Sequence, residues 1–290
     1  MPQRFEIIEL EQGTPEWLSV RLNHVTASNV AAIQNISPYK TRLEYFEELF
    51  NKKTKPIANN HAMQIGHLVE IAGREYCESH YGFKMAPAVV KSKVIPDLLA
   101  SLDGFNIDQE IIFESKYVGA EVLKSILESK IPDHHYAQVQ SQLLATGAKQ
   151  CIYFAQNPAG EVAIVEIKPS AETMTKIAED VTKFMQDVRE GNFPEPSDRD
   201  FISVNDLDLE TLRLLKLDID KRSEEYDTIK KRLDEKYKDV YRLKGNGVMM
   251  YRSIVKGSVQ YAKIPELQTL NLDAYRAKPR TQVTFKLTKE

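Results

Sequence analysis

The chain has 290 residues, 42% of them hydrophobic, which is enough to bury one large domain with an appendage or two small domains. Its 39 basic and 42 acidic side chains leave a formal charge of −3, which excludes a globally cationic protein, so a surface for nucleic acid must be a local patch. Two cysteines exclude a disulfide framework and a thiolate zinc or iron–sulfur site, and no apolar run approaches the length of a signal peptide or a membrane span. We expect a cytoplasmic protein in which Cys77 and Cys151 are reduced and buried.

The first part of the chain mixes helical and strand-like patterns. Residues 14–50 are predicted to be mostly helical, with a turn at Ser37. Apolar residues then recur at helical spacing over 63–81, and Gly82 ends that pattern. Strand-like runs follow at 88–95, 98–107, 110–118, 150–156 and 161–168.

Two further helices complete this region. One is predicted between Asp133, as its N-cap, and Gly147, whose lack of a side chain suits the position after a helix end. The other covers residues 170–190. The strands 98–107 and 110–118 are close enough in sequence to pair as a hairpin. The order helix, hairpin, helix, two strands and helix predicts an α/β fold with a central mixed sheet flanked by helices.

The composition changes near residue 195, where the stretch FPEPSDRD (193–200) predicts a linker. Beyond it, apolar residues from Leu212 to Val240 follow a 3-4 spacing that Arg222 interrupts. This pattern predicts a long amphipathic helix packed against its own domain or a sister subunit. We therefore predict a first domain over 1–194, a linker and long helix over 195–243, and a small β-rich extension over 244–290.

Three polar residues occupy the predicted hairpin. Side chains two apart on a strand share a face, so Glu114 and Lys116 point the same way, and Asp103 on the neighbouring strand can lie close to Glu114. Two adjacent carboxylates repel unless a cation or a proton lies between them, and Mg²⁺ or Mn²⁺ prefers such oxygen ligands. A lysine beside them could orient or deprotonate an attacking water. The alternative is an exposed Glu-Lys pair on a surface hairpin, worth under about 1 kcal/mol.

Two helices could add to this group. Glu70 and Arg74 share a helix face, so Glu70 could be a third inward carboxylate or half of an exposed ion pair. On the later helix, Gln138 and Gln142 share a face and could hold a water or a phosphate oxygen. They could equally be solvated glutamines on an outer face.

The chain resembles a known family through several short stretches. They are GTPEW (13–17), RLNHVTASNVAAI (21–33), SPYKT (37–41), GHLVEIAGRE (66–75), ASLDG (100–104), FESK (113–116) and YAQVQSQLLATG (136–147). In this order they cover about residues 13–170, and they resemble the YqaJ-like viral recombinase and phage lambda exonuclease family within the PD-(D/E)xK nucleases. The proline of that superfamily name is replaced here by Leu102.

The resemblance implies a PD-(D/E)xK, restriction-endonuclease-like core and a metal-dependent exodeoxyribonuclease. Such an enzyme digests double-stranded DNA from 5′ ends and leaves 3′ single-stranded tails for phage-type recombination by a single-strand annealing protein. It uses one or two Mg²⁺ ions, with Mn²⁺ as a substitute, and works in the cytoplasm of a bacterial or phage-infected cell. The lambda enzyme is a ring trimer, so the resemblance also implies a homo-oligomer.

The resemblance implies roles for particular residues of this chain. The implied metal ligands are Asp103, Glu114 and Glu70, the implied active-site partners are Lys116 and Gln138, and the implied 5′-phosphate pocket is Arg21, Ser28 and Ser101. From the residues alone, Ser28 could instead cap the helix that begins near Asn29, and Arg21 could be a surface charge.

Two other functions fit the same sequence. The extra C-terminal region could belong to an endonuclease of the same fold, which would nick closed circular DNA where an exonuclease would leave it intact. The chain could also be a catalytically inactive DNA-binding module, which would bind duplex DNA without metal and never cleave it.

Overall fold

The computed structural model describes residues 4–9, 14–54, 61–254 and a few positions between 257 and 270. The chain divides into two compact units, Met1–Ile202 and Ser203–Glu290. No helix among the described residues is both long enough and apolar enough to span a bilayer.

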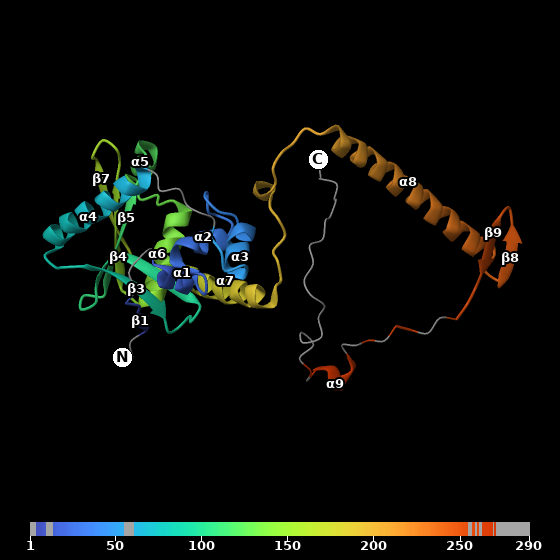
Figure 1. The fold of residues 1–290 in the computed structure, drawn as a ribbon, viewed down its shortest axis with the longest axis horizontal. Coiled ribbons are helices and arrows are strands. Elements are labelled where there is room, and N and C mark those ends of the chain that lie inside the picture. Colours follow the sequence, from blue (N-terminus) through green and yellow to red (C-terminus); the bar gives the residue numbers. More distant parts are fainter. Residues whose placement is uncertain are drawn as a thin grey trace. The chain divides into compact units, whose positions relative to one another are not determined.

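A mixed sheet of seven strands forms the centre of the first unit (Figure 1). Its strands are β1 Phe5–Ile7, β2 Val25–Thr26, β3 Ala86–Ser92, β4 Leu98–Asn106, β5 Ile111–Tyr117, β6 Gln150–Gln156 and β7 Val162–Ile167. They lie in the order β1-β3-β4-β5-β6-β7, with β2 beside β4. The β5–β6 and β2–β4 pairs are parallel and the others antiparallel, which confirms the predicted mixed sheet and the β4–β5 hairpin.

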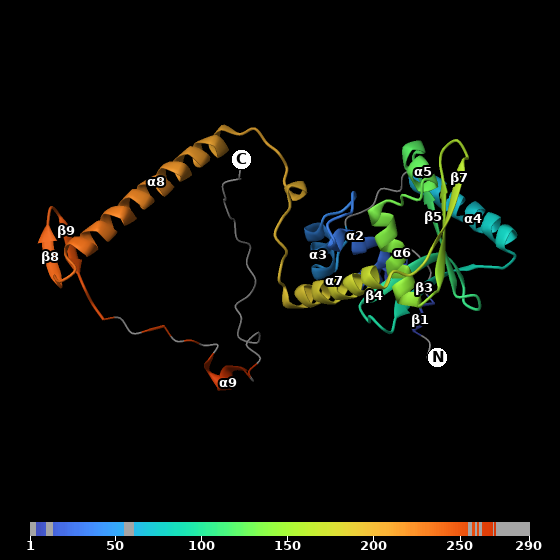
Figure 2. The ribbon, with the colours of Figure 1, turned by 180° about the vertical axis from the view of Figure 1, so that it is seen from behind.

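Helices cover both faces of this sheet, as Figure 2 shows from behind. They are α1 Pro15–Arg21, the 3₁₀ turn η1 Ala27–Asn29, α2 Val30–Ile33, α3 Arg42–Phe50, α4 His61–Tyr81, α5 Ala120–Leu127, α6 Asp133–Thr146 and α7 Ala171–Glu190. The apolar residues of α4 pack on one face, and those of α2, α6 and α7 pack on the other. This arrangement confirms the predicted α/β fold of sheet and flanking helices.

Local sequence signals fix several helix ends. Thr41 and Glu44 form a reciprocal capping box at the start of α3. Gly147 ends α6 in the left-handed conformation, with φ of 72°, as predicted. The prediction that Asp133 caps α6 is wrong, because Pro132 occupies the cap position and its carbonyl accepts from Tyr136 N at 2.9 Å.

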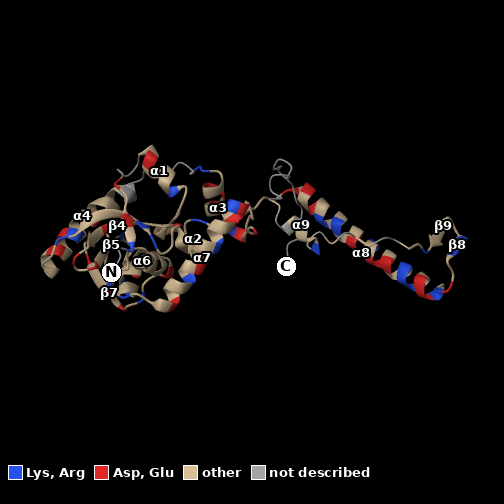
Figure 3. Ribbon diagram, turned by 90° about the horizontal axis from the view of Figure 1, so that it is seen from below, with Lys and Arg blue, Asp and Glu red and all other residues tan. Residues whose placement is uncertain are grey.

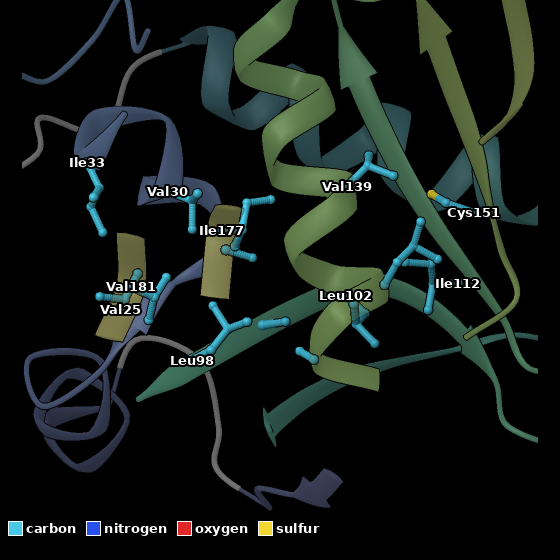
Figure 4. Packing of buried hydrophobic residues seen from close by; sticks show 14 of the residues in the cluster. Val25, Val30, Ile33, Leu98, Leu102, Ile112, Val139, Cys151, Ile177 and Val181 are labelled. Carbon is cyan, nitrogen blue, oxygen red and sulfur yellow. The ribbon is translucent and has the colours of Figure 1, made fainter. Parts of the chain in front are cut away.

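The core has two clusters. The larger lies between the sheet and α2, α6 and α7, and includes Val25, Val139 and Ile177 (Figure 4). The smaller lies under α4 and includes Val69, Cys77, Phe113, Ile152 and Phe154. Both cysteines are buried and free, as predicted.

The stretch predicted as a linker is held against the first unit. The Phe193 ring lies 4.6 Å from that of Phe46. Arg199, in the 3₁₀ turn η2 Asp198–Asp200, donates to the Ser37 and Pro38 carbonyls at 2.6 and 3.0 Å. A polar, proline-rich sequence therefore does not make this segment free.

The second unit consists of a long helix and a hairpin. Helix α8 runs over Leu207–Lys236 with Asp206 as its N-cap, and it carries many charged residues (Figure 3). None of its residues is buried by the described part of the chain. Strands β8 Arg242–Gly245 and β9 Val248–Tyr251 form a hairpin, and a short helix α9 covers Pro265–Gln268. The predicted helix and part of the predicted β-rich extension are therefore present, and much of residues 255–290 lies outside the described residues.

Candidate active site

One cavity of about 380 Å³ lies beside the middle of β4 and the C-terminal half of β5. Its lining includes Arg21, Ser28, Glu70, Ser101, Asp103, Glu114, Lys116 and Gln138. All the residues to which the family resemblance assigns roles are thus brought together, although they come from α1, η1, α4, β4, β5 and α6. The roles themselves stay predictions.

Glu114 is the most enclosed acid of the cavity, with 2% of its surface exposed. Its Oε1 accepts from Lys116 Nζ and, at 2.6 Å, from Gln138 Nε2. Its Oε2 accepts from Gln142 Nε2 at 2.5 Å. A buried carboxylate is tolerated only when it is paired and hydrogen-bonded, and these donors supply both. The exposed Glu-Lys pair considered from the sequence is therefore not what the hairpin contains.

The lysine of the motif is held between an acid and an amide. Lys116 Nζ contacts Glu114 Oε1 and donates to Gln138 Oε1 at 3.1 Å. Burial lowers the pKa of Lys116, but the charges of Glu114 and Asp103 outweigh burial, so the pKa of Lys116 is raised. The ammonium form favours a role in orienting water or stabilising negative charge over a role as a base.

Asp103 lies beside this group at partial burial. Its Oδ2 accepts from the Ser115 main-chain N–H at 2.8 Å. The pKa of Asp103 is raised well above its usual value, first by burial and then by the charge of Glu114, while Lys116 opposes the shift. Two neighbouring carboxylates repel each other when both are ionised, so a cation bound between them would be stabilised.

Glu70 reaches the cavity from α4. Its two carboxylate oxygens lie 3.5 Å from Arg74 Nη1 and 3.5 Å from His67 Nδ1. Arg74 also donates to the Asp103 carbonyl at 2.5 Å, so this arginine ties α4 to β4. Because Glu70 lines the cavity and Arg74 is largely buried, the pair is more than an exposed helix ion pair.

The donor atoms fit a hard divalent cation. Three carboxylates and the Gln138 amide oxygen line one cavity, and oxygen ligands are those that Mg²⁺ prefers. Across the described ranges, however, no three acidic, histidine or cysteine side chains converge as a ready-made metal site. Both oxygens of Glu114 accept hydrogen bonds from Lys116, Gln138 and Gln142, which a metal ion would have to replace.

Other residues of the same cavity suit an anion. The Arg21 guanidinium lies 4.5 Å from the centre of the Trp17 ring, and burial lowers the pKa of Arg21. The hydroxyls of Ser101 and Ser115 are buried and have no hydrogen-bond partner within the residues that the structure describes. Ser28 lies within η1, and the N-cap of the following helix α2 is Asn29, so the helix-cap alternative for Ser28 is wrong. A cation and free hydroxyls are what a phosphate group requires.

Two site residues were missed or misplaced by sequence reasoning. Gln142 was expected more often in solvent, but it is fully buried and donates both to Glu114 and, at 3.0 Å, to the Ser101 carbonyl. Strand alternation places Ser115 on the face opposite Glu114, yet it also lines the cavity because the cavity spans the end of β5. The spacing of Gln142, four residues after Gln138, placed both amides on one helix face, but it carried no sign that this face meets Glu114.

Comparisons with known proteins give a family and a fold. Residues 16–149 match the family model of the YqaJ-like viral recombinase domain, which confirms the resemblance inferred from the motifs. A crystal structure of the alkaline exonuclease LHK-Exo from Laribacter hongkongensis is 24% identical, with a TM-score of 0.52, and covers 61% of this chain and 94% of that chain. The structure of LHK-Exo with dAMP is 23% identical, with a TM-score of 0.53 and the same coverage. These similarities show a shared fold. Among curated proteins, none matches the chain significantly.

Proposed function

We propose that this chain, which carries a YqaJ-like viral recombinase domain over residues 16–149, is a metal-dependent exodeoxyribonuclease. The observation that carries the proposal is the single cavity in which three carboxylates, an ammonium and an amide face an arginine with free hydroxyls. This combination matches the needs of phosphodiester hydrolysis, which requires a nucleophile, neutralised phosphate charge and a positioned substrate. The LHK-Exo structures, which are of an exonuclease, support the same chemistry.

Asp103, Glu114 and Glu70 would hold one or two Mg²⁺ ions, with Mn²⁺ as a substitute. The bound metal supplies an activated water and neutralises charge on the scissile phosphate. The Lys116 ammonium would orient the nucleophile and stabilise negative charge, since it already lies between Glu114 and Gln138. Gln138 would hold Lys116 in place through its amide oxygen and Glu114 through its amide nitrogen.

Arg21, Ser28 and Ser101 would bind the phosphate of a 5′ end. Support comes from the buried Ser101 hydroxyl, which has no partner among the described residues, and from the exposed Ser28 hydroxyl, both in the cavity that Arg21 also lines. Binding the terminal phosphate at a fixed place would set the direction of digestion. In this proposal the enzyme degrades one strand of double-stranded DNA from its 5′ end and leaves a 3′ single-stranded tail.

The proposal extends to partners and setting. A 3′ tail is the substrate of a single-strand annealing protein, so the two would act together in phage-type recombination. In this proposal, recombination takes place in the cytoplasm of a bacterial or phage-infected cell. The regular apolar spacing on α8 also supports self-association, and the resemblance to a trimeric exonuclease makes a homo-oligomer the arrangement to test by measuring the mass in solution.

The test is digestion of linear duplex DNA beside closed circular DNA, in Mg²⁺ and in EDTA. We expect nucleotides to be released from the linear duplex in Mg²⁺ alone, with the circle intact. Nicking of the circle would identify an endonuclease. Binding of duplex DNA with no cleavage of either substrate would identify an inactive module, and the exonuclease proposal would then fail.

A further inference from the structure

An exposed tyrosine beside the candidate active site sits on a rigidly held loop. Tyr39 is 82% exposed, yet its main-chain N–H donates to the Ser37 hydroxyl at 3.2 Å. Arg199 donates to the carbonyls of Ser37 and Pro38, on the N-terminal side of Tyr39. The backbone is therefore fixed while the ring faces solvent.

The other end of the loop is fixed as well. Lys40 Nζ pairs with Glu48 at 2.6 Å, and the Thr41 hydroxyl donates to Asp200. Asp200 is in turn held by the Ser197 main-chain N–H at 2.7 Å. An aromatic ring that only filled a gap in the core would be buried, whereas this ring is presented outward by a braced backbone.

Tyr39 lies next to the candidate active site. It lines a second cavity of about 450 Å³, which shares Arg21 and Thr26 with the candidate active-site cavity. The centres of the Tyr39 and His134 rings lie 5.9 Å apart in an edge-to-face arrangement. His134 lies one turn before Gln138 on α6.

We propose that Tyr39 is a stacking platform for a nucleobase of the DNA strand that enters the active site, and that Arg199 and Asp200 are positioning residues for it. This inference rests on the proposed nuclease function. Every nucleobase has a flat π face, so stacking on an aromatic ring holds a strand without reading its sequence. A ring on a preorganised backbone also loses little conformational freedom on binding, which favours affinity.

The experiment measures kcat and KM on linear duplex DNA for the parent, Tyr39→Ala and Tyr39→Phe. We expect Tyr39→Ala to raise KM by about 5- to 100-fold, the range for loss of one base–aromatic stack, with kcat within about twofold. Tyr39→Phe should restore the parent KM because the ring alone is needed. The matched control is Tyr76→Ala on α4, since Tyr76 is also exposed, at 53%, and also lies beside a histidine ring.

A KM for Tyr39→Ala within twofold of the parent would overturn the platform, as would a Tyr39→Phe variant as impaired as Tyr39→Ala. In either case the parent still digests DNA, so failure of this inference is distinct from failure of the nuclease proposal, in which the parent is inactive.

The positioning role is tested by combining variants. Arg199→Ala should raise KM in the parent, because it releases the carbonyls of Ser37 and Pro38, but should have no further effect in Tyr39→Ala. If the two effects on KM multiply instead, Arg199 acts independently of Tyr39 and its positioning role is refuted.

Discussion

Enclosure of Glu114 by two glutamines and a lysine distinguishes the β4–β5 hairpin from an ordinary surface hairpin. A buried charge needs partners, and each of these donors can also turn to a water or a phosphate oxygen, which leaves the Glu114 carboxylate available to a metal ion. Asp103 has fewer compensating donors. Its raised pKa means that, without a metal ion, ionising Asp103 lowers the stability of the folded protein. Asp103, which would bind metal, is thus a residue that costs stability when it is ionised.

This cost gives a pH-dependent prediction for Asp103→Asn. The pKa of Asp103 is higher in the folded than in the unfolded protein. The protonated carboxyl therefore contributes stability that is fully present at low pH and is lost as pH rises through the folded-state pKa. Asparagine stays neutral and can still accept from the Ser115 N–H. In EDTA, the free energy of unfolding of Asp103→Asn relative to the parent should therefore increase between pH 5 and pH 9, measured by urea denaturation.

The control for that experiment is Asp108→Asn, which removes an exposed acid from the turn of the same hairpin and does not touch the cavity. Added Mg²⁺ should stabilise the parent and leave Asp103→Asn unchanged. A difference between Asp103→Asn and the parent that is independent of pH would show that Asp103 is not repelled by its neighbours.

Sequence reasoning reached some residues and not others for physical reasons. Period-two alternation placed Glu114 and Lys116 on one face, and their contact confirms it. The burial of Gln142 could not be read from α6 alone, because it depends on β5 supplying an acid from across the fold. The cap of α6 was misassigned because Pro132, which precedes Asp133, also suits a helix start.

At the scale of elements, α4 carries Glu70 to the cavity by packing closely on β6. A Cβ added at Gly73 would lie 2.7 Å from two ring atoms of Phe154, so glycine lets the helix approach the sheet. The helical pattern over 63–81 was enough to predict α4, but the close approach depends on a strand about 80 residues later. Sequence patterns therefore predicted the elements better than the contacts between them.

Gly73→Ala should lower the free energy of unfolding by about 1–3 kcal/mol, because the added Cβ would force the buried Phe154 ring to shift. Gly66→Ala, on the same helix, is the matched control. A Cβ there meets nothing within 4 Å, so alanine should be neutral or stabilise by up to about 1 kcal/mol. Equal effects of the two variants in urea denaturation would contradict the proposed close packing.

At the scale of the whole molecule, every residue of the candidate site lies in the first unit. Neither core cluster includes a residue beyond Val188 among the described residues. The segment after α7 nevertheless belongs to the first unit, because Phe193, Arg199 and Asp200 all contact α3 or the loop before it. Composition predicted a boundary near residue 195, and only the contacts show that the segment is anchored.

Two truncations separate these contributions. A chain that ends after Ile202 should keep the free energy of unfolding of the first unit, since no residue of its core is removed. A chain that ends after Asn192 should have a free energy of unfolding lower by about 1–3 kcal/mol. It lacks the Phe193 ring, which packs on two rings of α3, and the hydrogen bonds of Arg199 and Asp200. Identical urea denaturation curves for the two chains would show that the segment is not anchored in solution.

The central claim is that Asp103, Glu114 and Glu70 form a centre for divalent metal. The most direct measurement is anomalous diffraction at the manganese edge from crystals of the full chain soaked in Mn²⁺. We predict an anomalous peak in the candidate active-site cavity, bonded to carboxylate oxygens of Asp103 and Glu114, and no such peak in crystals of Asp103→Asn. Absence of a peak from the parent cavity, or carboxylates that still point to Lys116 and the glutamines at saturating Mn²⁺, would contradict the account.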